Sequence, residues 1–242
     1  MSERRRPLSR ERVLAAAVEV ADTDGVTGVT MRAVGDRLGV EAMALYRHVP
    51  GKDGLLDGLV AVVVEEVVAA AADLPATAGD DWRAALRKRV LRARTVMQRH
   101  PWAPALVMSR GDLGPGVMRW FEDLTAVLFD AGFDADLVHH ALHALGSRAL
   151  GFSPELFAVD SPAGSMDEEE AMAAVAAVAA AMPGIARVLE AMSHDAGSTL
   201  GMCDDDTEFR FGLDALLDGL EVRRAGGWQP PPRSAAVKAP PG

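Results

Sequence analysis

One short stretch of this chain carries side chains suited to holding a nucleic acid. They are two guanidinium groups, an ammonium group, a phenol and an imidazole, which come from Arg32, Arg47, Lys52, Tyr46 and His48. Arginine is the commonest ligand of guanine edges in the DNA major groove, and cationic or hydroxyl-bearing side chains hold the backbone phosphates. Side chains of these types can contact DNA if the elements that carry them place them on one surface.

The surrounding residues predict two short helices joined by a tight turn. Thr30 can cap the first helix by accepting an amide proton that the helix leaves unpaired. The apolar face of this helix comprises Ala33, Val34 and Leu38. Gly39 stands where a chain leaving a helix often needs a left-handed conformation, and the second helix is predicted over 41–48 with Leu45 facing inward. This is the plan of a helix-turn-helix, whose second helix lies in the major groove.

The same stretch resembles the tetracycline-repressor (TetR) family of bacterial transcription regulators. The features that match are a long first helix around 14–21, Thr-x-Arg at 30–32, Leu-Tyr-x-His at 45–48, and Lys52 followed by two leucines. The resemblance implies an all-α fold. A three-helix DNA-binding domain would be followed by a larger helical domain that binds a ligand and dimerises.

The resemblance also implies a role for each polar residue of this region. Arg32 matches the family arginine that reaches a base edge. Met43 and Ala44 would face the floor of the groove, and Ala42 would lie near the DNA backbone. The positions that hold phosphates are matched by Thr30, Tyr46, His48 and Lys52, while Arg47 could contact backbone or base. The alternative is that Tyr46 and His48 only pack their helix onto the first one.

The net charge of −10 would by itself disfavour DNA as a partner. The charge is unevenly distributed, because residues 1–52 carry nine Lys and Arg against seven Asp and Glu, whereas the rest carries 16 against 28. Local potential governs steering and non-specific affinity more than total charge does. We therefore expect DNA binding by the first part of the chain, with modest non-specific affinity.

Other features of the sequence favour a soluble, cytoplasmic protein. A single cysteine, Cys203, rules out an internal disulfide framework and fits a reducing compartment. The basic residues at 1–7 are not followed by the apolar segment of a signal peptide. The longest uncharged apolar run, 171–182, is shorter than the roughly 20 residues that cross a bilayer, so no membrane partner is expected.

Helical spacing and breakers predict the domain organisation. The predicted parts are a basic flexible arm (1–8), a DNA-binding domain (9–68), a linking helix (52–72), an effector-binding and dimerisation domain (80–224) and a disordered Pro/Gly-rich tail (225–242). The predicted helices outside the helix-turn-helix are 9–24, 52–72, 80–99, 113–130, 134–152, 167–182 and 206–224. Arginines 4–6 could enter a minor groove or form a solvated tail.

Two helices of the second domain are the candidates for a dimer interface, because the family packs two C-terminal helices of each subunit into a four-helix bundle. The residues assigned to this interface are Ala141, Ala144, Leu145, Ala149, Leu213, Leu216, Leu217 and Leu220. A dimer would double the DNA contacts of one short recognition helix. The alternative is that both helices belong to the core of a monomer.

The family resemblance further implies a cavity for a small apolar or amphipathic effector. The side chains available to line it are Met97, Trp102, Met108, Met118, Trp120, Phe121, His140, His143, Ser147 and Phe152, and ordinary core packing is the alternative for each. His139 and His143 lie one helical turn apart, which is half a metal site at best, so no metal or cofactor is expected. The histidines that the tetracycline repressor uses for its drug and magnesium are replaced here by Ser147 and Val107.

Enzymatic motifs are missing from the sequence: it has no Gly-rich phosphate loop and no Gly-x-Ser-x-Gly. Cys203 precedes three aspartates, which disfavour its thiolate. We expect no enzyme but a homodimeric repressor that a small effector releases from a palindromic operator. The alternatives are an activator or a ligand-independent regulator of the same fold and, more remotely, a small-molecule-binding helical protein or an enzyme without a DNA role.

Overall fold

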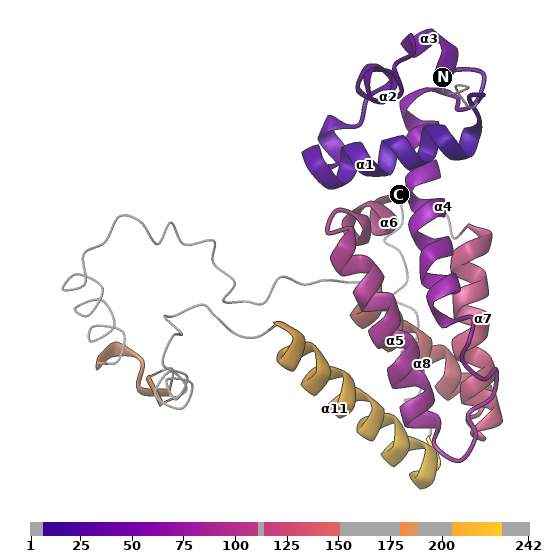
Figure 1. The fold of residues 1–242 in the computed structure, drawn as a ribbon. Coiled ribbons are helices and arrows are strands. Elements are labelled where there is room, and N and C mark those ends of the chain that lie inside the picture. Colours follow the sequence, from indigo (N-terminus) through magenta and orange to yellow (C-terminus); the bar gives the residue numbers. More distant parts are fainter. Residues whose placement is uncertain (1–6, 111–113, 151–179, 185, 188–204, 229–242) are drawn as a thin grey trace, which may run out of the picture. The chain divides into compact units, whose positions relative to one another are not determined.

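The computed structural model describes residues 7–110, 114–150, 180–184, 186–187 and 205–228 of the 242-residue chain (Figure 1). The described residues form helices and no strand, which confirms the predicted all-α class. The contacts discussed below lie within one compact unit, which comprises residues 1–152 and 215–242. The helices are α1 (Arg10–Gly28), α2 (Met31–Leu38), α3 (Ala42–Leu45), α4 (Gly51–Ala71), α5 (Trp82–Arg99), α6 (Ala103–Arg110), α7 (Pro115–Asp130), α8 (Ala135–Leu150) and α11 (Asp205–Gly226).

The ends of α1 and α2 follow from their capping residues. The Thr30 hydroxyl accepts a hydrogen bond from the Ala33 amide at 3.0 Å, as predicted. Gly39 ends α2 at φ 65° and ψ 39°, the left-handed conformation that glycine adopts most readily. Gly25, at φ 70°, interrupts α1 where the sequence predicts its end, although one more helical turn follows to residue 28.

Helix α3 is shorter than the predicted segment 41–48, because it ends at Leu45. A turn follows, in which the His48 amide donates to the Leu45 carbonyl at 2.8 Å. Pro50 keeps the chain from continuing as a helix past Val49, whose amide still donates to the Leu45 carbonyl at 3.0 Å, but it does not account for the end at Leu45. The side chains of Tyr46, Arg47 and His48 therefore stand on a turn rather than on a helix.

Helix α4 packs against α1 at one end and against α5, α6 and α7 along the rest of its length. The close approach to α1 occurs at Gly58, where an added Cβ would lie 2.2 Å from a methyl group of Leu14. A second close approach occurs at Gly116 of α7, where a Cβ would lie 2.9 Å from Val64. Glycine at these two positions lets the neighbouring helices touch α4 directly.

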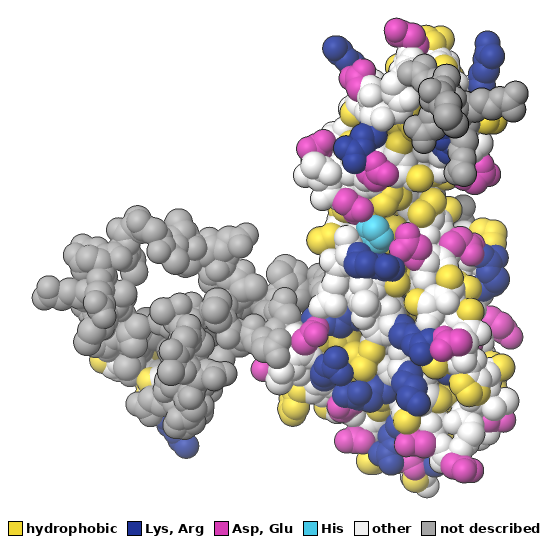
Figure 2. Space-filling model, viewed as in Figure 1, with side chains coloured by type: hydrophobic (Ala, Val, Ile, Leu, Met, Phe, Trp, Pro, Cys, Tyr) yellow, Lys and Arg dark blue, Asp and Glu magenta, His cyan; other side chains and the backbone are white. Residues whose placement is uncertain are grey.

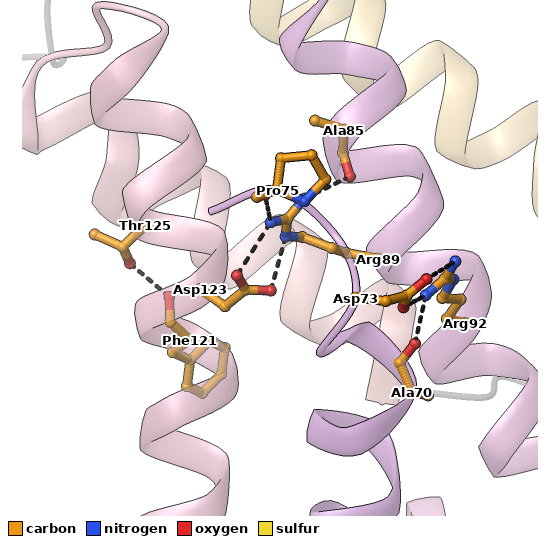
Figure 3. Close-up of polar contacts among 9 residues, drawn as sticks. All are labelled: Ala70, Asp73, Pro75, Ala85, Arg89, Arg92, Phe121, Asp123 and Thr125. Carbon is orange, nitrogen blue, oxygen red and sulfur yellow. Dashed lines mark hydrogen bonds and ion pairs between the residues drawn. The ribbon is translucent and has the colours of Figure 1, made fainter. Parts of the chain in front are cut away.

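A buried ion pair joins α5, α7 and the α4–α5 loop (Figure 3). Arg89, which is 1% exposed, donates from Nε to Asp123 Oδ2 at 2.7 Å and from Nη2 to Oδ1 at 3.1 Å. Its remaining protons reach the carbonyl groups of Ala85 and Pro75. Next to it, Arg92 donates to Asp73 at the end of α4 (Figure 3). The hydrogen bond from Arg92 lowers the pKa of the Asp73 carboxyl group below its ordinary value.

Helix α6 was not among the predicted helices. Its segment contains Pro101 and Pro104, which indicate a break when judged from sequence. Pro104 occupies the second position of α6, where a missing amide proton costs nothing because the first turn leaves its amides unpaired.

The C-terminal helix extends beyond its predicted end at 224. Helix α11 ends at Gly226, and the Trp228 indole donates to Asp136 of α8 at 2.7 Å. Two further contacts hold α11 to α5, namely Trp82 Nε1 to Glu221 and Arg83 to Asp218, both at 2.9 Å. Residues 1–6 of the predicted arm (1–8), residues 167–179 of the predicted helix (167–182) and residues 229–242 of the predicted tail (225–242) lie outside the described residues.

No helix in the described part of the chain is long and apolar enough to cross a membrane.

Candidate DNA-binding surface and effector site

The side chains predicted to contact DNA lie on one exposed surface formed by α2, α3 and the start of α4. Met43 and Tyr46 are 74% and 52% exposed, although both are large and partly apolar. The other exposed members of the set are Thr30, Arg32, Arg47 and Lys52, while Ala42, Ala44 and His48 are half-buried. Figure 2 shows Lys and Arg side chains projecting at the tip that these helices form, with acidic groups between them.

Arg32 is available for a DNA base. Its side chain is 90% exposed, and Nε lies 3.8 Å from Asp36 one turn later, which is a weak solvent-exposed pair. A DNA base edge would therefore compete only with that pair and with water. Arg37, by contrast, is bound to Glu19 of α1 at 2.7 Å and belongs to the packing between α1 and α2.

The position of α3 depends on two buried anchors. Leu45 is fully buried in the core that α1, α2 and α4 form. Gly35 of α2 lies against the turn, because a Cβ there would be 2.8 Å from the Val40 carbonyl oxygen and 3.3 Å from the Ala42 amide nitrogen. The sequence analysis missed Gly35. The sequence did contain a signal: a glycine in the middle of an amphipathic helix, about four residues before Gly39, indicates a position where another backbone segment comes close.

Polar contacts connect the DNA-binding helices to the rest of the chain on one side. Asp22 Oδ1 of α1 accepts a hydrogen bond from Trp102 Nε1 at 2.7 Å and lies 2.8 Å from His100 Nδ1. His100 is buried, and its Nε2 lies 3.5 Å from Glu66 Oε2 of α4. One carboxylate of α1 is thereby tied to the segment between α5 and α6.

A second connection joins α6 to the first turns of α4. Arg110 Nε donates to Asp57 Oδ1 at 2.7 Å, and Arg110 Nη2 donates to the Asp53 carbonyl at 3.0 Å. Asp53 is the residue after Lys52 of the DNA-binding surface. A displacement of α6 would therefore be transmitted to the part of α4 that borders the predicted DNA contacts.

The residues predicted to line the effector pocket differ in how far they are exposed. Met97 and Trp120 are buried, and Trp102 and Phe121 are half-buried. Met108, Met118, His140 and His143 are exposed, so these four do not face the interior of the chain. The helical phase explains this result, since their neighbours one or two positions along α6, α7 and α8 are the buried residues. The side chain of Ser147 and the whole of Phe152 lie outside the described residues.

Comparisons with known proteins match the whole of this arrangement. Residues 13–59 match the model "Bacterial regulatory proteins, tetR family", and residues 74–224 match the model "Tetracyclin repressor-like, C-terminal domain". The chain belongs to the TetR family. It is thus a DNA-binding transcription regulator with an N-terminal helix-turn-helix, as the resemblance implied.

Three relatives illustrate the likeness. The HTH-type transcriptional repressor DrrR1 of Streptomyces coeruleorubidus is 34% identical over 220 residues, which cover 89% of this chain and 78% of the relative. The class C tetracycline repressor protein of Escherichia coli is 28% identical over 219 residues, 90% of this chain and 92% of that one. The structure of ActR from Streptomyces coelicolor with actinorhodin is 21% identical, with a TM-score of 0.66 over 90% of this chain and 99% of that one, and shows the shared fold.

The residues predicted for the dimer interface of this TetR-family chain differ in exposure. Four of them are buried within the unit formed by residues 1–152 and 215–242, namely Ala141, Leu145, Leu217 and Leu220. Side chains that are already covered cannot bury further area against a partner. Ala144 and Leu216 are half-buried, and the side chain of Ala149 is not described. Phe211 and Val222 are the large apolar side chains that α11 exposes, each 71%.

The histidines of α8 lie together on its exposed side. The rings of His139 and His143 are 4.6 Å apart between centroids, and those of His139 and His140 are 5.3 Å apart. Within the described residues, no three His, Cys, Asp or Glu side chains are grouped so as to hold a metal ion.

Proposed function

We propose that this TetR-family regulator is a homodimeric repressor that a small molecule releases from a palindromic operator. The observation that carries this proposal is the pair of connections between the DNA-binding helices and the effector domain, from Asp22 to the α5–α6 segment and from Arg110 to α4. Such connections make the orientation of α1 and α4 depend on the state of the second domain.

In this proposal the exposed surface of α2 and α3 enters the major groove. Arg32 contacts a base edge, with guanine the commonest arginine target. Met43 supplies an apolar contact to a thymine methyl group, and Tyr46 and Lys52 hold phosphates on either side. Only one strongly hydrogen-bonding side chain then faces the bases, so sequence-dependent DNA shape contributes a large share of the specificity.

Dimerisation is proposed to use the exposed residues of α8 and α11. Phe211 and Val222 provide apolar area there, and the histidines of α8 add polar contacts. A two-fold dimer would present two α3 segments to successive major grooves, which are about 34 Å apart along the duplex. A family member without a partner would hold only one half-site.

The proposed effector binds among α5, α7 and α8 and displaces α6, which is tied to α4 through Arg110. A rotation of α4 would change the separation of the two DNA-binding surfaces, and the mismatch with the groove repeat would lower affinity. The structure of ActR has been determined in complex with actinorhodin, and the class C relative is named a tetracycline repressor protein. We infer a ring-containing natural product for this chain too. Ser147 and Val107 replace the metal-associated histidines of the tetracycline repressor, so the inferred effector needs no magnesium.

A fluorescence-anisotropy titration tests the proposal. The purified protein is titrated with the DNA upstream of its own gene and with a scrambled duplex, at about 0.15 M salt, where electrostatic binding is moderate. The expected result is a preference for the native duplex that disappears in the Arg32→Ala/Tyr46→Ala double variant. Arg83→Ala, which removes a similar exposed charge from α5, is the matched control and should bind like the parent.

Salt and effector provide the second half of the test. Lys52→Ala should weaken binding to both duplexes and reduce the salt dependence, because a phosphate contact carries no sequence information. Adding an effector to the complex should release the native duplex. If neither the upstream DNA nor selected genomic fragments bind better than the scrambled duplex, the DNA-binding proposal is refuted.

A further inference from the structure

Trp120 differs from the other three tryptophans of the chain in its hydrogen bonding. Trp82, Trp102 and Trp228 each donate their indole proton to a carboxylate, at 2.9, 2.7 and 2.7 Å. Trp120 is only 2% exposed, yet its Nε1 has no hydrogen-bond partner within the described part of the chain. Among the buried side-chain nitrogen and oxygen atoms of the described residues, Trp120 Nε1 is the one without a hydrogen-bond partner.

The side chain of Trp120 lies on the face of α7 that packs into the helical core. Val117, Leu124 and Val127 precede or follow it at helical spacing and are buried as well. Three residues further on, Asp123 pairs with Arg89 of α5. The face therefore looks into the helices α4, α5 and α8, all of which pack against α7.

An unpaired indole N–H in this position is costly for the free protein. A buried donor without a partner destabilises the folded chain relative to a paired one, and buried tryptophans normally find an acceptor. A phenylalanine would fill most of the same space without that penalty. A donor kept in an apolar core without a protein acceptor fits a partner that arrives from outside the chain.

We propose that Trp120 Nε1 donates a hydrogen bond to the effector. The ligand must offer an acceptor oxygen, because an indole nitrogen donates and cannot accept. The buried side chains on the same face of α7, Val117, Leu124 and Val127, are aliphatic, and the ring of Phe121 lies 5.4 Å from that of Trp120 between centroids. An acceptor on an apolar ring system, such as a ring carbonyl or phenol oxygen, fits these neighbours. This assignment names the ligand class of the proposed effector site and rests on that proposed function for its regulatory consequence.

The position of Trp120 gives the ligand direct access to the movement of α4. The preceding residue, Arg119, forms an ion pair with Glu65 of α4, and Gly116, one turn earlier, touches Val64. A ligand anchored at Trp120 therefore acts on α7 where α7 contacts the helix that enters the DNA-binding domain. Binding and the orientation of α4 are coupled through a single turn of α7.

Indole resonances in a ¹H–¹⁵N spectrum of tryptophan-labelled full-length protein test the assignment. Trp120→Phe identifies the Trp120 cross-peak by its loss. The probes are cyclohexanone, tetracycline with a chelator that removes divalent metal, and actinorhodin; methylenecyclohexane, which has the shape of cyclohexanone without the acceptor, is the control ligand. We expect at least one carbonyl probe to move the Trp120 cross-peak downfield and saturably, while the other three indoles, already bonded to carboxylates, stay in place.

Affinity provides the second readout. Trp120→Phe should weaken the tightest probe about tenfold, the loss expected for one hydrogen bond. Trp82→Phe, which deletes an indole already paired with Glu221, should lower the unfolding temperature and leave that affinity unchanged. If Trp120→Phe does not fold, Trp82→Phe, Trp102→Phe and Trp228→Phe assign the other three indole cross-peaks, the fourth is that of Trp120, and its shift in the parent protein decides the matter. The assignment is overturned if none of the three carbonyl probes moves the Trp120 cross-peak, or if Trp120→Phe binds the tightest probe as well as the parent does.

The two proposals fail in different ways. A probe that moves the Trp120 resonance but leaves the DNA complex intact would support the binding site and count against effector release. A compound that releases DNA while the Trp120 resonance stays in place would support effector release and refute this anchor.

Discussion

Replacing Gly35 by alanine should impair DNA binding more than it impairs stability. Gly35 lies in α2, and an alanine Cβ there would be 2.8 Å from the Val40 carbonyl oxygen, whereas ordinary contact begins at 3.4 Å. The obstructing atoms belong to the backbone of the turn, so no rotation of a side chain can relieve the clash. Gly35→Ala must therefore displace the turn, and α3 with it, by about 0.6 Å, the difference between the two distances.

Two opposing terms set the effect on stability. Overpacking of this kind costs about 1–3 kcal/mol, while replacing a mid-helix glycine by alanine returns about 0.8–1 kcal/mol of helix propensity. The net loss should be about 0–2 kcal/mol, which a urea denaturation can resolve. The DNA contacts are more sensitive, because a shift of about 0.6 Å takes a hydrogen bond of ordinary length beyond its working range. Loss of one base contact, worth about 1–3 kcal/mol, predicts a reduction in operator affinity of about 5- to 150-fold.

Gly219→Ala in α11 is the matched control for this experiment. Its Cβ would meet only the end of the flexible Arg223 side chain, at 3.3 Å, and the residue is far along the chain from α3. It should gain helix propensity and leave DNA affinity unchanged. If Gly35→Ala bound the operator within twofold of the parent and were equally stable, the tight packing of α2 on the turn would not set the position of α3.

Three further predictions concern polar contacts. Asp123→Ala should lower the free energy of unfolding by about 3–5 kcal/mol, because it leaves the buried Arg89 without its carboxylate. The control Asp218→Ala, which breaks an exposed ion pair, should lower it by at most about 1 kcal/mol. Equal losses for the two variants in urea denaturation would contradict this prediction. Asp22→Asn should leave operator affinity of the free protein nearly intact but reduce the effector-induced release measured by anisotropy, since it weakens the connection of α1 to α5 and α6; full release would show that this connection is dispensable. The pKa of the Asp73 carboxyl group is lowered in the folded chain, so its contribution to stability is present above the ordinary carboxyl pKa and disappears as the pH falls through the lowered value. Asp73→Asn should therefore reduce the loss of stability that the parent shows on acidification below about pH 4. An unchanged dependence of the melting temperature on acid pH would refute this prediction.

Local signals in the sequence predicted most of the helix ends correctly. Thr30 and Gly39 bound α2, and Gly132, at φ 82°, separates α7 from α8. Capping and positive-φ glycines act within a few residues, so they can be recognised without knowledge of the fold. Helix α6 was missed because Pro104, which indicates a break in a sequence, is tolerated in the first turn of a helix.

Contacts between distant residues could not be predicted. Arg89 and Asp123 are 34 positions apart, and nothing in the pattern of either helix indicates that one buries its charge against the other. The apolar stripes of α8 and α11 were recognised, but amphipathicity does not reveal whether a second helix of the same chain or a second chain covers a stripe. Leu217 and Leu145 are buried by residues of the same chain.

The linking helix shows what the sequence could decide about mechanism. Its residues are apolar on most faces, and α4 contacts α1 as well as α5, α6 and α7. At Gly58, against α1, and at Gly116, against α7, the packing leaves no room even for an added Cβ. Because packed interfaces switch between discrete arrangements rather than deform gradually, α4 can rotate only if its contacts with α1 and α7 repack together. In the proposed mechanism, a ligand that alters the packing of α7 near Trp120 acts through α4 on α1, and through α1 on the surface that carries Arg32 and Tyr46.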